Sequence, residues 1–288
     1  MLLKEYTLDP DLFAQPDLIK IFIRDFGMDK GRVLSLVPKS WLRLAADQLN
    51  KTSNSVNRKE AEIIISTLQK WKMQGIAIRS PSRKSVEYMT PWIQYVEGFK
   101  TNPFDGVLTQ KESEKSLKPD TIWLEPPQWQ VDSSATVPLL ASKFLPYLHR
   151  LFSVSEQINI IDPYFNLEDS KYWPFWEGLA QLVVQHDHIK KIVFITADHK
   201  APNQILGRSQ ERLAMIKNLE VYIARADQVE GGMHDRFILS DVAGFSFSNS
   251  FQEKPDELVE IARLGSKSYQ CRVNQFVNSL HKFQLLTI

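Results

Sequence analysis

Strand-like segments alternate with helix-like segments through the second half of the chain, and this alternation constrains the fold more than any other feature. Apolar runs at 157–162, 191–196 and 219–224 have the length and the β-branched content of buried strands. Between them, the segments 174–187 and 203–217 are predicted to be helices. Strands that alternate with helices predict parallel pairing within a sheet whose two faces are covered by helices.

A hairpin is predicted after the last of these strands. The segments 233–240 and 244–250 are strand-like and are separated by only three residues, so we expect them to pair antiparallel. The C-terminal half is therefore predicted to be an α/β domain with a mixed sheet flanked by helices. Its other expected elements are a strand at 121–124, a helix at 135–152 that Pro146 should kink, and helices at 254–264 and 273–283.

The first part of the chain is predicted to be mostly helical. Helices are expected at 16–28, 39–50 and 57–72, with only a short strand at 76–78. The mostly polar stretch 110–120 is the best candidate for a linker, and the alternative is a loop within one domain. We therefore expect a mostly helical N-terminal domain followed by the α/β domain.

Length and composition fit two modest soluble domains. The chain has 288 residues, and we place the domains at 1–115 and 116–288. Hydrophobic residues make up 43% of the sequence and charged residues 24%, which is ordinary for a globular protein. The formal net charge of +1 excludes a strongly basic chain but allows a local basic groove of the kind that binds nucleic acid.

Several features favour a cytoplasmic protein. No apolar run reaches the roughly 18 residues that a transmembrane span needs, and the first residues have no signal-peptide core. Cys271 is the only cysteine, which excludes an intrachain disulfide and fits a reducing compartment. The chain has no Cys-x-x-Cys or His-Glu-x-x-His motif, and the spacing of His186 and His188 does not place them on one helix face. We expect these two histidines to be solvated, and we expect no metal and no cofactor.

One short segment carries the clearest functional signal. It runs from His234 through Arg236 to Asp241 within the first hairpin strand. Because side chains alternate between the faces of a strand, His234 and Arg236 are expected to point the same way. Such a pair suits a phosphate ester, since the cation can hold the oxygens while the imidazole attacks or protonates. The polar residues Ser248, Asn249 and Ser250 follow on the second hairpin strand and are candidates for further phosphate contacts.

The residues from about 120 to 288 resemble a phospholipase-D-like domain. That family carries a His-x-Lys-x4-Asp motif followed by a Gly-Ser-x-Asn element. Here His234 matches the nucleophilic histidine, Arg236 occupies the lysine position, and Asp241 matches the aspartate. The downstream Ser248-Asn249-Ser250-Phe251-Gln252 can be aligned in two ways, with either Ser250 at the family serine or Asn249 at the family asparagine.

The resemblance implies a mechanism that uses two copies of the motif. In the family, one histidine attacks phosphorus to form a phosphohistidine and the other protonates the leaving oxygen, without a metal. This chain has a single motif, so the resemblance implies a homodimer in which the second His234 comes from another subunit. The arginine variant also resembles domains of bacterial defence and DNA-processing proteins, and the membrane-binding C-terminal domains of MIT-domain proteins, which are not thought to be enzymes.

Arginine in the lysine position weakens the expectation of catalysis more than that of binding. A guanidinium binds phosphate bidentately. Its greater size would displace phosphorus relative to His234, and a displacement of about 1 Å can cost roughly a hundredfold in rate. An attacking imidazole must be neutral and needs an acceptor on its other nitrogen. The acidic residues expected on the next helix are candidates for this acceptor, and they are Glu253, Glu257 and Glu260.

Two other strand ends could border the site. Asp162-Pro163-Tyr164-Phe165 follows a buried strand, with its aromatic residues either in the core or at the cleft, and His199 follows the next strand. We expect a cytoplasmic phosphodiesterase that acts on DNA or RNA. The alternatives are a non-catalytic binding subunit of a larger defence or DNA-processing complex, and a binder of anionic lipid headgroups.

Overall fold

The computed structural model describes residues 1–288 except 52–54, 74–76, 79–80, 84–90, 199–209 and 287–288. The chain divides into two compact units, with Leu3–Asp132 in unit 1 and Ser133–Ile288 in unit 2. Both units combine helices with a β-sheet, so the α/β fold class is confirmed. The division falls between residues 132 and 133, later in the chain than the expected boundary at 115.

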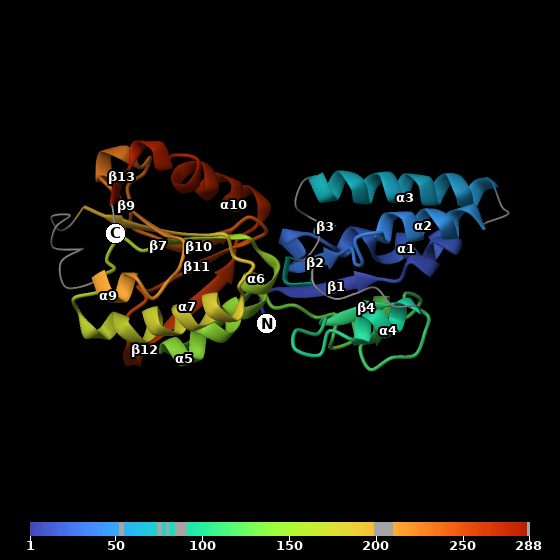
Figure 1. Ribbon diagram of the computed structural model, residues 1–288, viewed down its shortest axis with the longest axis horizontal. Helices are drawn as coiled ribbons and strands as arrows, with labels where there is room; N and C mark the ends of the chain where they lie inside the picture. The colour runs from blue at the N-terminus through green and yellow to red at the C-terminus, as the bar shows by residue number, and fades with distance from the viewer. Residues whose placement is uncertain (52–54, 74–76, 79–80, 84–90, 199–209, 287–288) are drawn as a thin grey trace. The chain divides into compact units, whose positions relative to one another are not determined.

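Unit 1 contains a five-stranded sheet in the order β3-β2-β1-β4-β5, and every pairing within it is parallel. Figure 1 shows α1, α2 and α3 on one face of this sheet and α4 on the other. The strands are β1 (Lys4–Leu8), β2 (Arg32–Ser35), β3 (Ala77–Ile78), β4 (Gly106–Leu108) and β5 (Ser116–Leu117). The helices are α1 (Pro16–Phe22), α2 (Trp41–Asn50), α3 (Ser55–Met73) and α4 (Trp92–Glu97).

The three helices expected in this part of the chain are present as α1, α2 and α3, although α1 ends at Phe22, but α4 and most of the sheet were not predicted. The central strand β1 was missed because its buried side chains alternate between polar Glu5 and Thr7 and apolar Tyr6 and Leu8. The segment 110–120 is not a linker, because β5 lies within it and pairs with β4. Short parallel strands of this kind gain their stability from the layers that cover them, which a local sequence pattern does not reveal.

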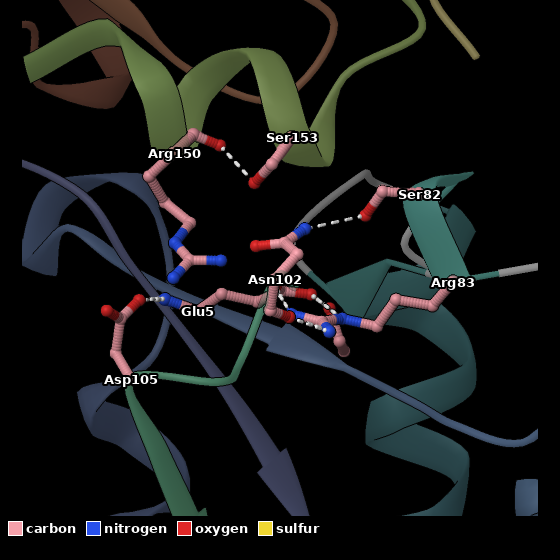
Figure 2. Close-up of polar contacts among 8 residues, drawn as sticks. Glu5, Ser82, Arg83, Asn102, Asp105, Arg150 and Ser153 are labelled. Carbon is pink, nitrogen blue, oxygen red and sulfur yellow. Dashed lines mark hydrogen bonds and ion pairs between the residues drawn. The ribbon is translucent and has the colours of Figure 1, made fainter. Parts of the chain in front are cut away.

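The core of unit 1 encloses a buried ion pair. Arg83 donates two hydrogen bonds to the Glu5 carboxylate, from Nε to Oε1 at 3.1 Å and from Nη2 to Oε2 at 2.5 Å. Both side chains are fully buried. Ser35 donates to Glu5 Oε1 at 2.5 Å, and Arg83 Nη1 donates to the carbonyl oxygen of Asn102. Figure 2 shows the guanidinium lying between Glu5 and Asn102. This bidentate geometry satisfies both charges away from water.

Unit 2 contains an eight-stranded mixed sheet in the order β13-β9-β8-β7-β10-β11-β12-β6. The strands β7, β8 and β9 are parallel, and the other pairs are antiparallel. Figure 1 shows α10 on one face of this sheet and α5 and α7 on the other. The strands are β6 (Ser134–Leu139), β7 (Gln157–Ile161), β8 (Lys191–Ala197), β9 (Leu219–Ala224), β10 (Arg236–Ser240), β11 (Gly244–Phe247), β12 (Lys254–Arg263) and β13 (Gln284–Leu286).

The helices of unit 2 follow the expected order with some differences. The segment expected as one helix at 135–152 begins as strand β6, and Pro146 lies in a 3-10 turn between α5 and α6. The helices are α5 (Ala141–Phe144), α6 (His149–Val154), α7 (Trp173–Gln185), α9 (Gln210–Leu213) and α10 (Ser266–Arg272), and a π-helix (Val273–Val277) continues α10. No helix within the described residues is long and apolar enough to cross a membrane.

Three other expectations were wrong or only partly correct. The segment 254–264 is not a helix but strand β12, in which Val259 and Ile261 alternate with exposed residues and face the core. The segment 121–124 ends in a 3-10 helix (Ile122–Leu124) rather than forming a strand. Of the helix expected at 203–217, residues 203–209 lie outside the described part, and α9 covers only 210–213 of the rest.

A group of histidines lies where α7 ends. The ring centroid of His186 is 4.9 Å from that of His149 and 5.5 Å from that of His188. Only 5% of His186 is exposed, and its Nε2 has no hydrogen-bond partner among the residues that the structure describes, so the expectation that it is solvated was wrong. Burial, together with the neighbouring imidazoles, lowers the pKa of His186 from 6.5 to about 4. The folded protein therefore holds this imidazole in its neutral form.

We expect this neutral histidine to make the protein less stable as the pH falls from about 6.5 to about 4. The unfolded chain takes up a proton near 6.5, whereas the folded chain does so only near 4, so each pH unit between them costs up to about 1.4 kcal/mol. The total is at most about 3 kcal/mol. Thermal unfolding of wild type and His186→Gln at pH 7 and pH 4.5 checks this. An equal drop in Tm for both proteins would contradict it.

Candidate functional site

The candidate residues gather where three neighbouring strands of the unit 2 sheet begin or end. At this side of the sheet, called the site edge below, β7 and β11 end and β10 begins. Arg236 opens β10 and pairs with Phe247 of β11. On its other side, Phe237 pairs with Ile161 of β7. Continuing that antiparallel register by one residue places Asp162 opposite Arg236. The sheet topology thus brings together residues that are more than 70 positions apart in the chain.

Arg236 presents a cation that no carboxylate neutralises by direct contact. Its guanidinium carbon lies 4.8 Å from the ring centroid of Tyr164, and the side chain is half-buried. No salt bridge or hydrogen bond joins this side chain to any residue that the structure describes, and its Nε is buried without an acceptor. Because the side chain is only half-buried, a guanidinium without a carboxylate partner among the described residues favours an anionic ligand from solvent.

His234 lies at the site edge but not within the strand. Strand β10 begins at Arg236, so the expectation that alternation along a strand would orient both side chains was wrong. His234 is exposed, and it follows Gly231 and Gly232, which both adopt φ of +78°. A Cβ at Gly232 would lie 3.0 Å from His234 Nε2. Glycine therefore allows both the left-handed turn and the close approach of the imidazole.

Asp241 lies at the other end of β10, away from His234 and Arg236. The five residues of this strand separate the two ends, which at about 3.3 Å per residue amounts to roughly 16 Å. The Asp241 carboxylate accepts hydrogen bonds from the backbone N–H groups of Glu156 at 3.1 Å and Gln157 at 3.3 Å. It thereby holds the start of β7 against the turn after β10. Its role in this arrangement is structural, and it does not join the candidate site.

The Ser248–Ser250 segment reaches the site, but its side chains are already hydrogen-bonded. Ser248 Oγ accepts from the backbone N–H of Glu260 at 2.9 Å, and Asn249 donates to the carbonyl oxygen of Leu258 at 3.2 Å. Ser250 is buried and donates to Asp162 Oδ2 at 2.5 Å. These contacts tie the end of β11 to β12 and to β7. Their expected role as direct phosphate contacts stays a prediction.

Asp162 lies at the candidate site, although sequence reasoning assigned it no definite role there. Its carboxylate is fully buried and accepts from the backbone N–H groups of Tyr164 at 2.9 Å and Phe251 at 3.1 Å, in addition to the Ser250 hydroxyl. Burial raises the pKa of Asp162, while these hydrogen bonds and the charge of Arg236 oppose that shift. The sequence signal was an Asp-Pro-Tyr turn directly after an apolar strand, which is typical of an Asx-turn.

The glutamates that were expected to orient His234 lie elsewhere. Glu253 accepts from the backbone N–H of Ala141 at 2.6 Å, and Glu257 pairs with Lys254 at 2.7 Å. Glu260 lies on strand β12, not on a helix. No hydrogen bond to the His234 imidazole is present in the described part of the chain, and the described residues contain no group of three His, Cys, Asp or Glu arranged to hold a metal ion. His199 falls outside the described residues.

Comparison with known proteins does not assign the chain to a family. No protein-family model matches the sequence, and no curated protein matches it. Among solved structures, the chain is similar to that of TrmBL2, an archaeal chromatin protein whose structure shows a novel mode of DNA binding. The match covers 57% of this chain and 59% of TrmBL2, with 10% sequence identity and a TM-score of 0.33. A similarity this low carries no argument about the present chain.

Proposed function

We propose that the site edge formed by Arg236 and His234 binds a phosphodiester of DNA or RNA and that His234 attacks its phosphorus. The observation that supports this proposal is the half-buried guanidinium of Arg236, which has no ion pair or hydrogen bond with the described residues. A phosphate oxygen would accept a charge-assisted hydrogen bond from its accessible N–H groups. The imidazole of His234, two residues before Arg236 in the chain, is exposed and would attack the phosphorus of the same phosphate.

The chemistry we propose proceeds in two steps. A neutral imidazole nitrogen of His234 forms a bond to phosphorus while the bond from phosphorus to the leaving oxygen breaks, and that oxygen takes a proton from a second imidazole. Water then attacks the phosphohistidine, gives its proton back to the second imidazole and releases the phosphate monoester. The second imidazole would come from His234 of another copy of the chain, as the resemblance to phospholipase-D-like domains implies.

A second candidate function is phosphodiester binding without cleavage. It is favoured by the lack of any hydrogen bond that would fix the tautomer of His234 in the described residues. It is also favoured by Arg236, because the larger guanidinium alters the position of phosphorus relative to the attacking nitrogen. In that case the site would recognise nucleic acid within a larger defence or DNA-processing complex.

Replacing Arg236 with glutamine tests both candidates. We expect binding of a fluorescently labelled oligonucleotide to weaken by about 10- to 150-fold at low salt, because one hydrogen-bonded charge contact of roughly 1.5–3 kcal/mol is lost. Arg236→Lys should retain part of the affinity, because lysine keeps the charge but not the bidentate geometry. Fluorescence anisotropy measures the dissociation constants, and gel electrophoresis of the same mixtures, with and without EDTA, detects cleavage.

Lys217→Gln is the matched control for this experiment. Lys217 is exposed and precedes β9. Strand β9 runs parallel to β7, so it begins at the end of the sheet opposite to the site. Replacing Lys217 should therefore change affinity less than about threefold. Binding that depends on Arg236 together with cleavage supports the phosphodiesterase. Binding that depends on Arg236 without cleavage supports the second candidate. Equal affinities for wild type and Arg236→Gln would contradict both.

A further inference from the structure

We infer that the Arg236 site takes a single nucleic-acid strand rather than a duplex, with one base stacked on Tyr164 beside the bound phosphate. This inference rests on the proposed function and specifies its substrate class. Tyr164 follows β7 and Pro163, and 45% of it is exposed. The ring contacts the guanidinium of Arg236, which has no ion pair among the described residues. Proteins bind single strands with this combination of an exposed aromatic side chain and a cation.

The backbone of Tyr164 is held in place by two hydrogen bonds, whose partners are in turn linked through Ser250. Its N–H donates to Asp162 Oδ1 at 2.9 Å, and its carbonyl oxygen accepts from the Tyr172 hydroxyl at 2.9 Å. The Tyr172 hydroxyl also lies 3.2 Å from Ser250 Oγ, which is bonded to Asp162. This buried network fixes Tyr164 relative to Arg236 before any ligand binds. A platform that is already ordered loses less conformational entropy on binding.

An apolar cavity continues from Tyr164. It is narrow and partly open, and the side chains of Leu167, Trp176, Phe194 and Leu213 contribute to its lining together with Tyr164. Apolar and aromatic surface directly beside a phosphate-binding cation does not suit inorganic phosphate, which has no apolar part. It suits a nucleotide, in which a flat base follows the charged backbone.

A second pair of a guanidinium and an aromatic ring lies next to residues that line this cavity, although neither member of the pair lines it. The guanidinium carbon of Arg212 lies 3.6 Å from the ring centroid of Trp173, and the buried Nε of Arg212 also has no hydrogen-bond partner among the described residues. Arg212 precedes the lining residue Leu213, and Trp173 Nε1 donates to the carbonyl oxygen of the lining residue Leu167 at 2.8 Å.

The proximity of Arg236 and Tyr164 favours a single strand. Their contact at 4.8 Å means that a phosphate at the guanidinium brings the base of the same or the adjacent nucleotide to the tyrosine ring. In a duplex that base is paired and stacked inside the helix, and extruding it costs a few kcal/mol. In a single strand the base is available for stacking on an aromatic side chain.

Replacing Tyr164 with leucine tests the inference. We expect binding of a labelled single-stranded oligonucleotide to weaken by about 5- to 150-fold, because the stacking of one base is lost. Binding of an abasic strand of the same length, which has phosphates but no bases, should not change. Tyr164→Phe keeps the aromatic ring and should bind like wild type. Wild type should also bind the single strand more tightly than a duplex of the same sequence. Fluorescence anisotropy at one fixed salt concentration measures all of these affinities.

The abasic strand separates failure of this inference from failure of the proposed function. If wild type binds the abasic and the base-bearing strand equally, or prefers the duplex, the inference is wrong while Arg236-dependent phosphodiester binding stands. If Arg236→Gln binds every strand as tightly as wild type does, the proposed function fails as well. Thermal unfolding of Tyr164→Leu and Tyr164→Phe shows whether both variants are folded. Loss of affinity in Tyr164→Leu with retention in Tyr164→Phe supports the inference.

Discussion

Replacing His234 with alanine is expected to lower the rate of phosphodiester cleavage by about a thousandfold or more, because it removes the attacking nitrogen of the proposed reaction. The imidazole is exposed and makes no hydrogen bond with the described residues, so its removal should leave the fold intact. Affinity for the oligonucleotide should change less than about tenfold, since Arg236 still holds the phosphate. Single-turnover cleavage with enzyme in excess separates the chemical step from binding.

His281→Ala is the matched control for this substitution. His281 is also an exposed histidine of unit 2, and its Nδ1 contacts the carbonyl oxygen of Asn278 rather than any residue of the site. This variant should cleave at the wild-type rate. If His234→Ala cleaves as fast as wild type does, His234 is not the nucleophile and any activity belongs to another site. Equal losses in both variants would indicate a general effect on the protein instead.

The parallel strands of unit 2 could be predicted from the sequence because burial on both faces makes them apolar at nearly every position. The runs at 157–162, 191–196 and 219–224 correspond to β7, β8 and β9 within one or two residues. An edge-proximal antiparallel strand such as β12 gives a weaker signal, because one face is exposed and five charged residues interrupt it. Its spacing of Leu258, Val259 and Ile261 resembles a helix as much as a strand.

The site was only partly predictable, because its geometry depends on pairings between distant strands. The sequence indicated His234, Arg236 and the Ser248–Ser250 segment at neighbouring strand ends, and the structure places them at the site edge. It could not show that Asp162 lies across from Arg236, because that depends on the register between β7 and β10. It also could not show that Asp241 lies at the far end of β10 from Arg236. The sequence pattern did not fix the residues at which this strand begins and ends.

The buried ion pair of unit 1 allows a prediction about stability of similar size to the one about catalysis. Glu5 and Arg83 are separated by 78 positions and meet in the core, where the guanidinium carbon also lies 3.7 Å from the ring centroid of Phe104. Transfer of two charges out of water is expensive, and their mutual attraction offsets that cost only while both partners are present. Removing Glu5 leaves the Arg83 guanidinium charged and buried without its carboxylate.

Replacing Glu5 with glutamine is therefore expected to lower the free energy of unfolding of unit 1 by about 3–5 kcal/mol. The double variant Glu5→Leu/Arg83→Met should recover much of this loss, because an apolar pair leaves no uncompensated charge. Urea unfolding followed by tryptophan fluorescence measures both, and it reports mainly on unit 1, because Trp41, Trp71, Trp92, Trp123 and Trp129 lie there and only Trp173 and Trp176 lie in unit 2.

Glu60→Gln provides the control that isolates the effect of burial. Glu60 pairs with Lys20 at 2.5 Å, as close as Glu5 is to Arg83, but the two side chains are 28% and 44% exposed. Water screens such a pair, so its loss should cost less than about 1 kcal/mol. If Glu5→Gln lowers stability no more than Glu60→Gln does, the buried charges of Glu5 and Arg83 do not depend on each other. A large loss of stability in Glu5→Gln but not in Glu60→Gln means that an ion pair of the same length contributes more to the stability of unit 1 when it is buried than when it is exposed.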